Sequence, residues 1–496
     1  MIIVPFFIII PLATAFIIPM IAKFEERFQD ALAIISSLAI FVLSAFACIS
    51  LGKSASGVMA YKLGNLLPPA GIALIIDGLS AFMLVTVNLV AFFIALYASG
   101  YMKKYTDKWK FYSLFFLMLS GINGVLLASD IFNLYVFMEI AAIAAYFLVA
   151  FGTGAEELEA AFKYAIMGSV ASCFILLGIA FLYGHTSTLN MADMASALAM
   201  SGPSKVVQFV SVLFIMGFGL KAALAPFHAW LAYAHSSAPA PVSAMLSGVL
   251  IKVLGIYALC RIFFNVFGMS IVVSQILMVL AVLSMIVGAI LAFGQSDIKK
   301  LFAYSTVSQI GYVALGLGIG TPLAIFGAFF HLFNHSIFKS LLFMDAGSVE
   351  TLKGTRDLNK ISGVLADAPI TGYSSLISAL SICGVPPLGG FWSKAIIIFA
   401  CIQAHRPVLA FIAALVSILT LAYYFRALTP ALFGAGSGVK TRPTPAMNIA
   451  MAAMAVLVIA SALALLPSIR NALFNGAVNV VTDGIAYAAA ITGAIR

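Results

Sequence analysis

The stretch Gly217-Phe-Gly-Leu-Lys221-Ala-Ala-Leu-Ala-Pro226-Phe-His228-Ala-Trp230-Leu places a lysine and a proline inside a long apolar run. A charged side chain at mid-bilayer costs roughly 2.5–3.5 kcal/mol on insertion scales, so this lysine must pair or reach water. Pro226 cannot donate a backbone hydrogen bond and should break the helix close to Lys221. The carbonyl groups that this break frees can solvate the charge. The alternative, in which Lys221 snorkels to the interface, conflicts with the apolar sequence on both sides.

The rest of the chain has the composition of an integral membrane protein. Of its 496 residues, 63% are hydrophobic and 9% are charged, whereas soluble domains carry roughly 25% charged residues. A bilayer crossing needs about 20 apolar residues, and splitting the chain at polar and Gly/Pro breaks leaves about 14 such spans. We therefore predict an all-α integral membrane protein with about 14 transmembrane helices.

The net charge of +9 does not indicate nucleic-acid binding, because the basic residues lie in short loops that set membrane orientation. Loops after odd-numbered spans hold 15 Lys and Arg residues. The opposite side holds seven: Lys53, Lys62, Lys205, Arg261, Arg406, Arg470 and Arg496. Both termini are thus expected on the outer side of a prokaryotic inner membrane. The N-terminus lacks a basic region and a cleavage site, so we expect a retained first helix.

A second break is expected in Gly384-Val-Pro386-Pro387-Leu-Gly389-Gly390-Phe-Trp-Ser393-Lys394. Discontinuous helices in transporters occur where backbone lines a cavity or ion site. The two broken spans, seven and twelve, are five apart and so run in opposite directions, which predicts two inverted five-helix repeats.

The repeats give a domain organisation. Residues 1–110 form the first three helices, 111–265 the first repeat, 266–434 the second, and 435–496 helix 14 with a short tail. The tail from Ser468 is mildly amphipathic, and it could lie on the membrane surface or pack against a neighbour.

Further ionisable residues lie inside apolar spans. Glu139 lies near the middle of the fifth span and Lys252 about three turns into the eighth. His331, His335 and Lys339 follow i, i+4, i+8 spacing and share one helix face. A histidine–histidine–lysine stripe is hard to explain as packing, whereas Glu139 alone could be a carboxylate bonded to a neighbouring hydroxyl. Together these residues predict a charge-lined proton path.

Two secondary candidates are weaker. Asp77 opens the third span close to the interface, where a solvated helix end and a functional role are equally good readings. His228 follows the break at Pro226. The five cysteines form no CxxC pair and the histidines no ligand pattern, so we expect no metal, cofactor, redox centre or hydrolytic site in this chain.

Four segments together resemble the antiporter-like subunits of respiratory complex I, multi-subunit Mrp sodium/proton antiporters and membrane-bound energy-converting hydrogenases. The motifs are residues 133–139, 221–231, 331–339 and 384–394, and the resemblance covers roughly residues 60–430. It implies fourteen helices, two inverted repeats and a membrane-plane row of charges. By motif position, the row comprises Glu139, Lys221, Lys252, His331, His335, Lys339 and Lys394.

Departures from the family pattern narrow the choice. The given sequence stops soon after span fourteen, so we expect no lateral helix of the kind that the longest family member has, and it carries Lys252 and Lys394 where other members have His and Glu. It most resembles the D-type subunit of Mrp antiporters, and also the related subunits of redox pumps. The expected function is proton translocation in a multi-subunit complex, with Na⁺ as a second candidate ion and homologous membrane subunits as partners. The alternative is a non-translocating membrane scaffold.

Overall fold

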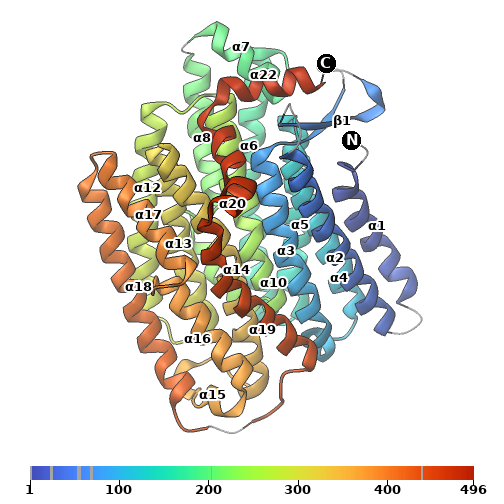
Figure 1. The fold of residues 1–496 in the computed structure, drawn as a ribbon. Coiled ribbons are helices and arrows are strands. Elements are labelled where there is room, and N and C mark those ends of the chain that lie inside the picture. The colour runs from blue at the N-terminus through green and yellow to red at the C-terminus, as the bar shows by residue number, and fades with distance from the viewer. Residues whose placement is uncertain are drawn as a thin grey trace.

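A computed structural model describes residues 3–22, 26–52, 57–66, 71–202, 204–436 and 439–495. The chain forms a bundle of long helices that run along a common direction (Figure 1). Of the basic residues counted for orientation, Lys23, Lys53 and Arg496 lie outside the described residues.

The first half of the chain contains a short hairpin and the helices before residue 267. The elements are α1 (Phe6–Ile21), α2 (Glu26–Leu51), β1 (Met59–Lys62), β2 (Ala73–Ile76), α3 (Gly78–Tyr101), α4 (Lys108–Leu127), α5 (Ile131–Val149), α6 (Ala155–Thr186), α7 (Met191–Ser201), α8 (Lys205–Lys221), α9 (Ala229–Ser237), α10 (Ala240–Met245), η4 (Leu246–Leu250), η5 (Lys252–Tyr257), α11 (Ala258–Cys260) and η6 (Arg261–Val266).

The elements of the second half are all helices, long and short. They are α12 (Ile271–Phe293), α13 (Ile298–Ile319), α14 (Pro322–Lys353), η7 (Leu358–Lys360), α15 (Val364–Asp367), α16 (Pro369–Cys383), α17 (Gly389–Gln403), α18 (Pro407–Phe433), α19 (Pro445–Ala460), η8 (Ser461–Leu465), α20 (Pro467–Arg470), η9 (Asn471–Asn475), α21 (Gly476–Thr482) and α22 (Gly484–Ile495).

Polar residues at the edges of the apolar runs begin several helices. The Asp77 side chain accepts a hydrogen bond from the Ser80 amide at the start of α3, and Asp130 accepts one from the Asn133 amide at the start of α5. Thr321 caps α14 in the same way. Such caps satisfy amide groups that have no partner inside the helix, and so they fix where each helix starts.

One element departs from an all-α fold. Strands β1 and β2 pair antiparallel between α2 and α3, with Met59 opposite Ile76 and Lys62 opposite Ala73. The C-terminal tail packs on the chain itself: α21 contacts α3 and α14, and α22 contacts α7 and β1. In Figure 1, α22 lies across the end of the bundle that also carries α7.

Helix α14 occupies the centre of the bundle. It contacts α3, α10, α13, α16, α17 and α19, and from Phe329 to Ala346 all its residues are buried. A helix buried on all sides must satisfy its polar side chains within the protein, which makes the histidines and the lysine of α14 candidates for function.

The two predicted helix breaks are present. Helix α8 ends at Lys221 and α9 begins at Ala229, with Pro226 between them; α16 ends at Cys383 and α17 begins at Gly389, with Pro386 and Pro387 between them. Close packing explains the glycines at the second break. A Cβ atom on Gly389 would lie 2.1 Å from the Asn334 side chain, and one on Gly390 would lie 1.9 Å from the Ser381 carbonyl.

Within the described residues, ten helices are long and apolar enough to cross a membrane, or eleven if the bent pair Pro467–Thr482 and Tyr487–Ala494 forms one span. Three further apolar helices are shorter: Phe6–Ile21, Pro369–Cys383 and Gly389–Gln403. The chain is therefore a multi-pass membrane protein built almost entirely from helices.

Candidate functional site: a row of buried charges

Glu139 and Lys221 form an ion pair between α5 and the end of α8. The Lys221 Nζ lies 3.2 Å from the Glu139 Oε1. Ser172 of α6 bridges the pair: its hydroxyl donates to Glu139 at 2.5 Å and accepts from Lys221 at 3.0 Å. The lysine side chain is 4% exposed and the glutamate side chain 23% exposed. The hydroxyl contact expected of a packing carboxylate is thus present, but it serves an ion pair.

Lys252 lies fully buried where the eighth span is wound as a π-helix. Its Nζ donates to the carbonyls of Ser247 at 2.7 Å and Gly248 at 2.6 Å. In the part of the chain described, no carboxylate lies within ion-pair distance of it. Backbone carbonyl groups therefore solvate this amine, and π-helical turns of this kind are frequent at functional sites.

The stripe on α14 divides into two environments. The His331 Nδ1 lies 2.9 Å from the Ser393 hydroxyl, and the rings of His331 and His335 are 6.2 Å apart. Neither ring nitrogen of His335 has a hydrogen-bond partner among the described residues. Lys339 donates instead to the Tyr424 hydroxyl of α18 at 3.4 Å. The stripe thus presents the His331 imidazole toward α17 and the Lys339 amine toward α18.

Lys394 of α17 lies beside the second break. Its Nζ donates to the Ile382 carbonyl at 2.6 Å and to the Ser417 hydroxyl at 3.4 Å. The neighbouring residue Ser393 contacts His331. The break at Pro386 and Pro387 thus leaves carbonyl groups near the end of α16 that bind this amine, as expected for a discontinuous helix.

Close packing connects the separate charges. A Cβ atom on Gly255 would lie 2.4 Å from Ala222, so the end of α8 abuts η5; one on Gly248 would lie 1.9 Å from the Ser340 hydroxyl of α14. Lys252 is near enough to His335 and Lys339 to interact electrostatically. No direct hydrogen bond joins Lys221 to Lys252 within the described residues.

Of the secondary candidates, Asp77 is not at a solvated helix end. Both carboxylate oxygens accept from Arg261 of η6, at 2.5 and 2.6 Å, and both side chains are 1% exposed. Arg261, assigned from sequence to an outer loop, is therefore buried. The pair links the start of α3 to the end of the eighth span. His228 lies half-buried in the break, with its ring 6.4 Å from that of Tyr304.

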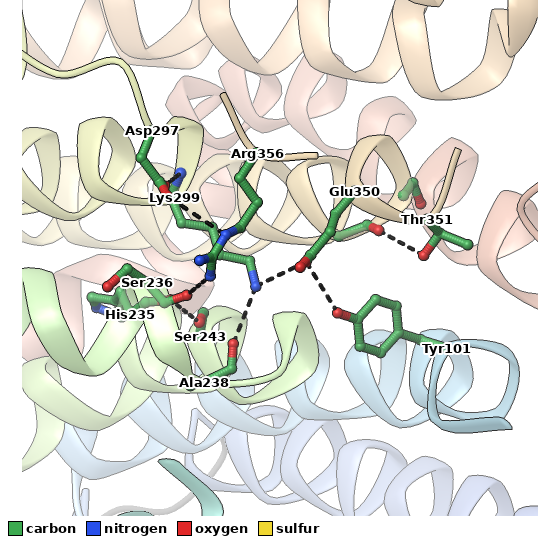
Figure 2. Close-up of polar contacts among 12 residues, drawn as sticks. Tyr101, His235, Ser236, Ala238, Ser243, Asp297, Lys299, Glu350, Thr351 and Arg356 are labelled. Carbon is green, nitrogen blue, oxygen red and sulfur yellow. Dashed lines mark hydrogen bonds and ion pairs between the residues drawn. The ribbon is translucent and has the colours of Figure 1, made fainter. Parts of the chain in front are cut away.

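A cluster of ion pairs covers the end of the bundle where α13 begins and α14 ends (Figure 2). The Lys299 Nζ lies 3.1 Å from Glu350 and donates to the Ala238 carbonyl at 3.2 Å. The Tyr101 hydroxyl donates to Glu350 at 3.5 Å. We call Asp297, Lys299, Glu350 and Arg356 the ion-pair cluster.

Arg356 completes the cluster. Its guanidinium lies 3.5 Å from Asp297 and also donates to the Ser236 carbonyl. In the same loop, hydrogen bonds from the Asn359 amide hold the pKa of Asp357 below its ordinary value. The cluster therefore ties the end of α9 to α13 and α14 through one buried and three partly exposed charges.

Sequence reasoning missed several polar groups that the fold brings to this row. His235 is fully buried under the ion-pair cluster, stacked on Phe343 at 4.7 Å. Ser172 and Tyr424 carry no sequence signal, because a serine or tyrosine in an apolar span is ordinary. His235 does carry one, since it lies in the seventh span with Lys221. Among the described residues no group of three or more His, Cys, Asp or Glu could hold a metal ion.

Comparison with known proteins places this site in context. Residues 128–420 match the family described as "NADH:quinone oxidoreductase/Mrp antiporter, TM", and residues 69–112 match "NADH-Ubiquinone oxidoreductase (complex I), chain 5 N-terminus". The chain is 37% identical over 426 residues to NADH-quinone oxidoreductase subunit N of Desulforudis audaxviator, covering 85% of this chain and 84% of that protein. It is 33% identical to the D-type Na⁺/H⁺ antiporter subunit of Alkalihalophilus pseudofirmus, with 84% of each covered.

Chains of two solved membrane complexes are also similar to this chain in structure. A chain of the membrane-bound sulfane sulfur reductase, an archaeal respiratory membrane complex, has a TM-score of 0.91 at 30% identity, with 98% of this chain and 99% of that chain covered. A chain of the Mrp complex from a Dietzia species has a TM-score of 0.89 at 26% identity, with 98% of each covered. This protein belongs to the antiporter-like subunit family that NADH:quinone oxidoreductases and Mrp antiporters share.

Proposed function

We propose that this chain is the proton-translocating membrane subunit of a multi-subunit ion-pumping complex. The observation that carries the proposal is the Glu139–Ser172–Lys221 triad, a partly buried ion pair at 3.2 Å beside a helix break. Burying a lysine and a glutamate costs free energy, and a purely structural subunit would gain nothing in return. In a proton-translocating subunit, an ion pair that forms and separates can bind and release a proton, which explains why these charges are present.

The proposed route runs from Glu139 and Lys221 through Lys252 and the α14 stripe to Lys394. While Glu139 is ionised, it stabilises the charged form of Lys221. When Glu139 is neutralised or moves, that stabilisation is lost, and Lys221 passes its proton toward Lys252. Carbonyl groups and hydroxyls bind the amines of Lys221, Lys252 and Lys394, which supports a hydrated polar chain through which protons move.

We infer fourteen crossings. Besides the ten long apolar helices, α1, the pair α8 and α9, α14, and the pair α16 and α17 each supply one more. An even number of crossings leaves both ends of the chain on one side, and in Figure 1 both marked ends lie at the same end of the bundle. The broken helices are the fourth crossing of residues 111–265 and of residues 266–434, which supports two inverted repeats.

We infer that the ion-pair cluster faces the cytoplasm of a prokaryotic cell and that both termini face outward. The loops at that end carry Lys300, Lys353 and Lys360 in addition to the cluster. Basic residues concentrate in cytoplasmic loops because positive charges resist translocation.

Partner subunits follow from the surface around Glu139. Its side chain is 23% exposed, and its neighbours on α5 and α6 include the exposed apolar residues Val136, Ile143 and Val170. A charged carboxylate cannot face hydrocarbon without a large cost. We therefore infer that another membrane subunit covers this face, and homologous antiporter-like subunits are the first candidates.

Two complexes remain candidates, and similarity extends to both. One is a Mrp-type Na⁺/H⁺ antiporter, in which this chain is the D-type subunit; the other is a redox pump of the complex I or hydrogenase kind. Purifying the intact complex decides between them. Iron, nickel or flavin in the preparation identifies the redox pump, and Na⁺-driven proton flux without these groups identifies the antiporter.

The proposal is tested by Lys221→Ala in membrane vesicles that contain the whole complex. An imposed potassium diffusion potential drives protons, and a pH-sensitive dye reports them. We expect transport to fall on the order of a hundredfold because a positioned proton-transfer group is lost. Lys163→Ala is the matched control, since Lys163 is exposed and pairs with Glu159. Wild-type transport by Lys221→Ala at normal complex abundance would contradict the proposal.

A further inference from the structure

Asp345 is a buried carboxyl group that the proposed route does not use. It lies on α14, six residues beyond Lys339, and is 1% exposed. Its Oδ1 accepts a hydrogen bond from the Ser374 hydroxyl of α16 at 2.5 Å, and its Oδ2 lies 3.5 Å from the Ser378 hydroxyl. The carboxyl group thus faces α16, whereas Lys339 faces Tyr424 of α18.

This carboxyl group has no cationic partner within the described residues, although seven lysines and three histidines are buried in the same bundle. The nearby Tyr97 hydroxyl donates to the Met344 carbonyl at 2.7 Å and so is not a donor to Asp345. An isolated ionised carboxylate in a protein interior costs several kcal/mol. A buried carboxyl group that is held by hydroxyls alone is therefore expected to carry a proton and to be neutral.

Hydroxyl groups form a column along the same face of α16. Its members follow helical spacing and are all buried: Thr371, Ser374, Ser375, Ser378 and Ser381. The hydroxyls of Thr371 and Ser381 have no hydrogen-bond partner among the described residues. Buried hydroxyls without a protein partner are where ordered water usually lies, so both ends of the column can hold water.

The column runs from the exposed end of the bundle that carries α15 to the second helix break beside Lys394. It starts near Pro369 and Ile370, which are exposed at the end of the bundle that carries α15. It stops at the second helix break, where Gly390 packs on Ser381 and the Lys394 Nζ donates to the Ile382 carbonyl. Asp345 lies beside the middle of this column.

We propose that Asp345 is an additional proton carrier, which exchanges protons between the α15 end of the bundle and Lys394 through the α16 hydroxyls. This inference rests on the proposed function, because it supplies a branch of the same proton route. In the step, the neutral carboxylic acid releases one proton to a hydroxyl or water of the column, which passes one of its own protons onward. Asp345 then regains a proton from the opposite direction, so no electron or other group is transferred.

The test uses the whole complex in vesicles and compares Asp345→Asn, Asp345→Glu and Asp193→Asn. Asparagine keeps the shape and the hydrogen bonds of a neutral carboxyl but cannot carry the proton. We expect Asp345→Asn to lower proton flux on the order of a hundredfold, with flux recovered in Asp345→Glu and unchanged in Asp193→Asn, which lies on α7 outside this site. Infrared difference spectra recorded between two pH values should show a carboxyl C=O band that Asp345→Asn removes.

Two results overturn the inference: wild-type flux in Asp345→Asn, or a pH-difference spectrum that this substitution leaves unchanged. Measuring Lys221→Ala in the same vesicles distinguishes a failure of the role of Asp345 from a failure of the proposed function. If Lys221→Ala abolishes flux and Asp345→Asn does not, only the role of Asp345 fails. If Lys221→Ala also leaves flux unchanged, the proposed function itself fails.

Discussion

Replacing Glu139 with glutamine removes one charge from the central ion pair and changes little else. The glutamine amide can still contact the Ser172 hydroxyl, which now lies 2.5 Å from the carboxylate, and its volume is nearly the same. Among the described residues, Lys221 then keeps a hydrogen bond to the neutral Ser172 hydroxyl. The substitution therefore isolates the contribution of the carboxylate charge to the charged state of Lys221.

The magnitude follows from the geometry. At 3.2 Å and an effective dielectric constant of about 20, Coulomb's law gives an attraction of about 5 kcal/mol. Removing one partner of a buried ion pair costs about 3–5 kcal/mol. Because the Glu139 side chain is 23% exposed, we take the lower value of about 3 kcal/mol, which corresponds to roughly a hundredfold change in a rate or equilibrium.

Proton flux into vesicles carrying the whole complex should therefore fall roughly a hundredfold in Glu139→Gln, while complex abundance on a native gel stays normal. Glu159→Gln is the matched control, because Glu159 forms an exposed pair with Lys163 and should transport as the wild type does. Glu139→Asp, which keeps the charge but shortens the reach, should give an intermediate flux. Wild-type flux in Glu139→Gln with a normal amount of complex would refute the role of this pair.

Three further predictions concern other parts of the row. Lys252→Met should abolish proton flux without loss of complex, since among the described residues the Ser247 and Gly248 carbonyls are the only groups that hold its amine. Lys205→Met at the exposed start of α8 should keep its flux, and equal flux in both variants would contradict this. Gly390→Ala places a Cβ atom 1.9 Å from the Ser381 carbonyl and should destabilise the fold by about 1–3 kcal/mol through overpacking. The control is Gly493→Ala, because nothing lies within 4 Å of the added Cβ atom there. Equal melting temperatures of the two variants in detergent would contradict the packing explanation. Arg261→Ala leaves Asp77 buried without its partner and should lower the free energy of unfolding by about 3–5 kcal/mol. Adding Asp77→Asn should recover part of this stability. If the effects of the two substitutions are strictly additive in the double variant, the two side chains are not coupled.

Several features of the site could be predicted because each is local in sequence. A charge inside an apolar run identifies Glu139, Lys221, Lys252, Lys339 and Lys394 wherever the helices lie. Prolines and glycines identify both breaks, since their backbone limits act within one turn of helix. The spacing of His331 and His335 fixes their common face for the same reason.

Other features could not be predicted because they depend on which helices become neighbours. Arg261 reads as a loop residue from its position at the end of an apolar run, yet it lies buried against Asp77, 184 residues away. Asp345 is an acidic residue within an apolar run and so carries a sequence signal, but nothing in the sequence indicates that it faces the hydroxyls of α16. The ion-pair cluster also joins segments that are far apart in the chain.

By itself the sequence determined that this protein lies in a membrane, where its helices break and which buried charges need partners, because hydrophobicity and backbone limits act along the chain. Only the tertiary structure decided which partners those charges have. It joined Glu139 to Lys221 through Ser172, gave Lys252 carbonyl groups instead of a carboxylate, and set Asp345 against a column of hydroxyls. An ion pair or a hydrogen bond depends on distances of a few ångströms between helices, and such distances are set by packing.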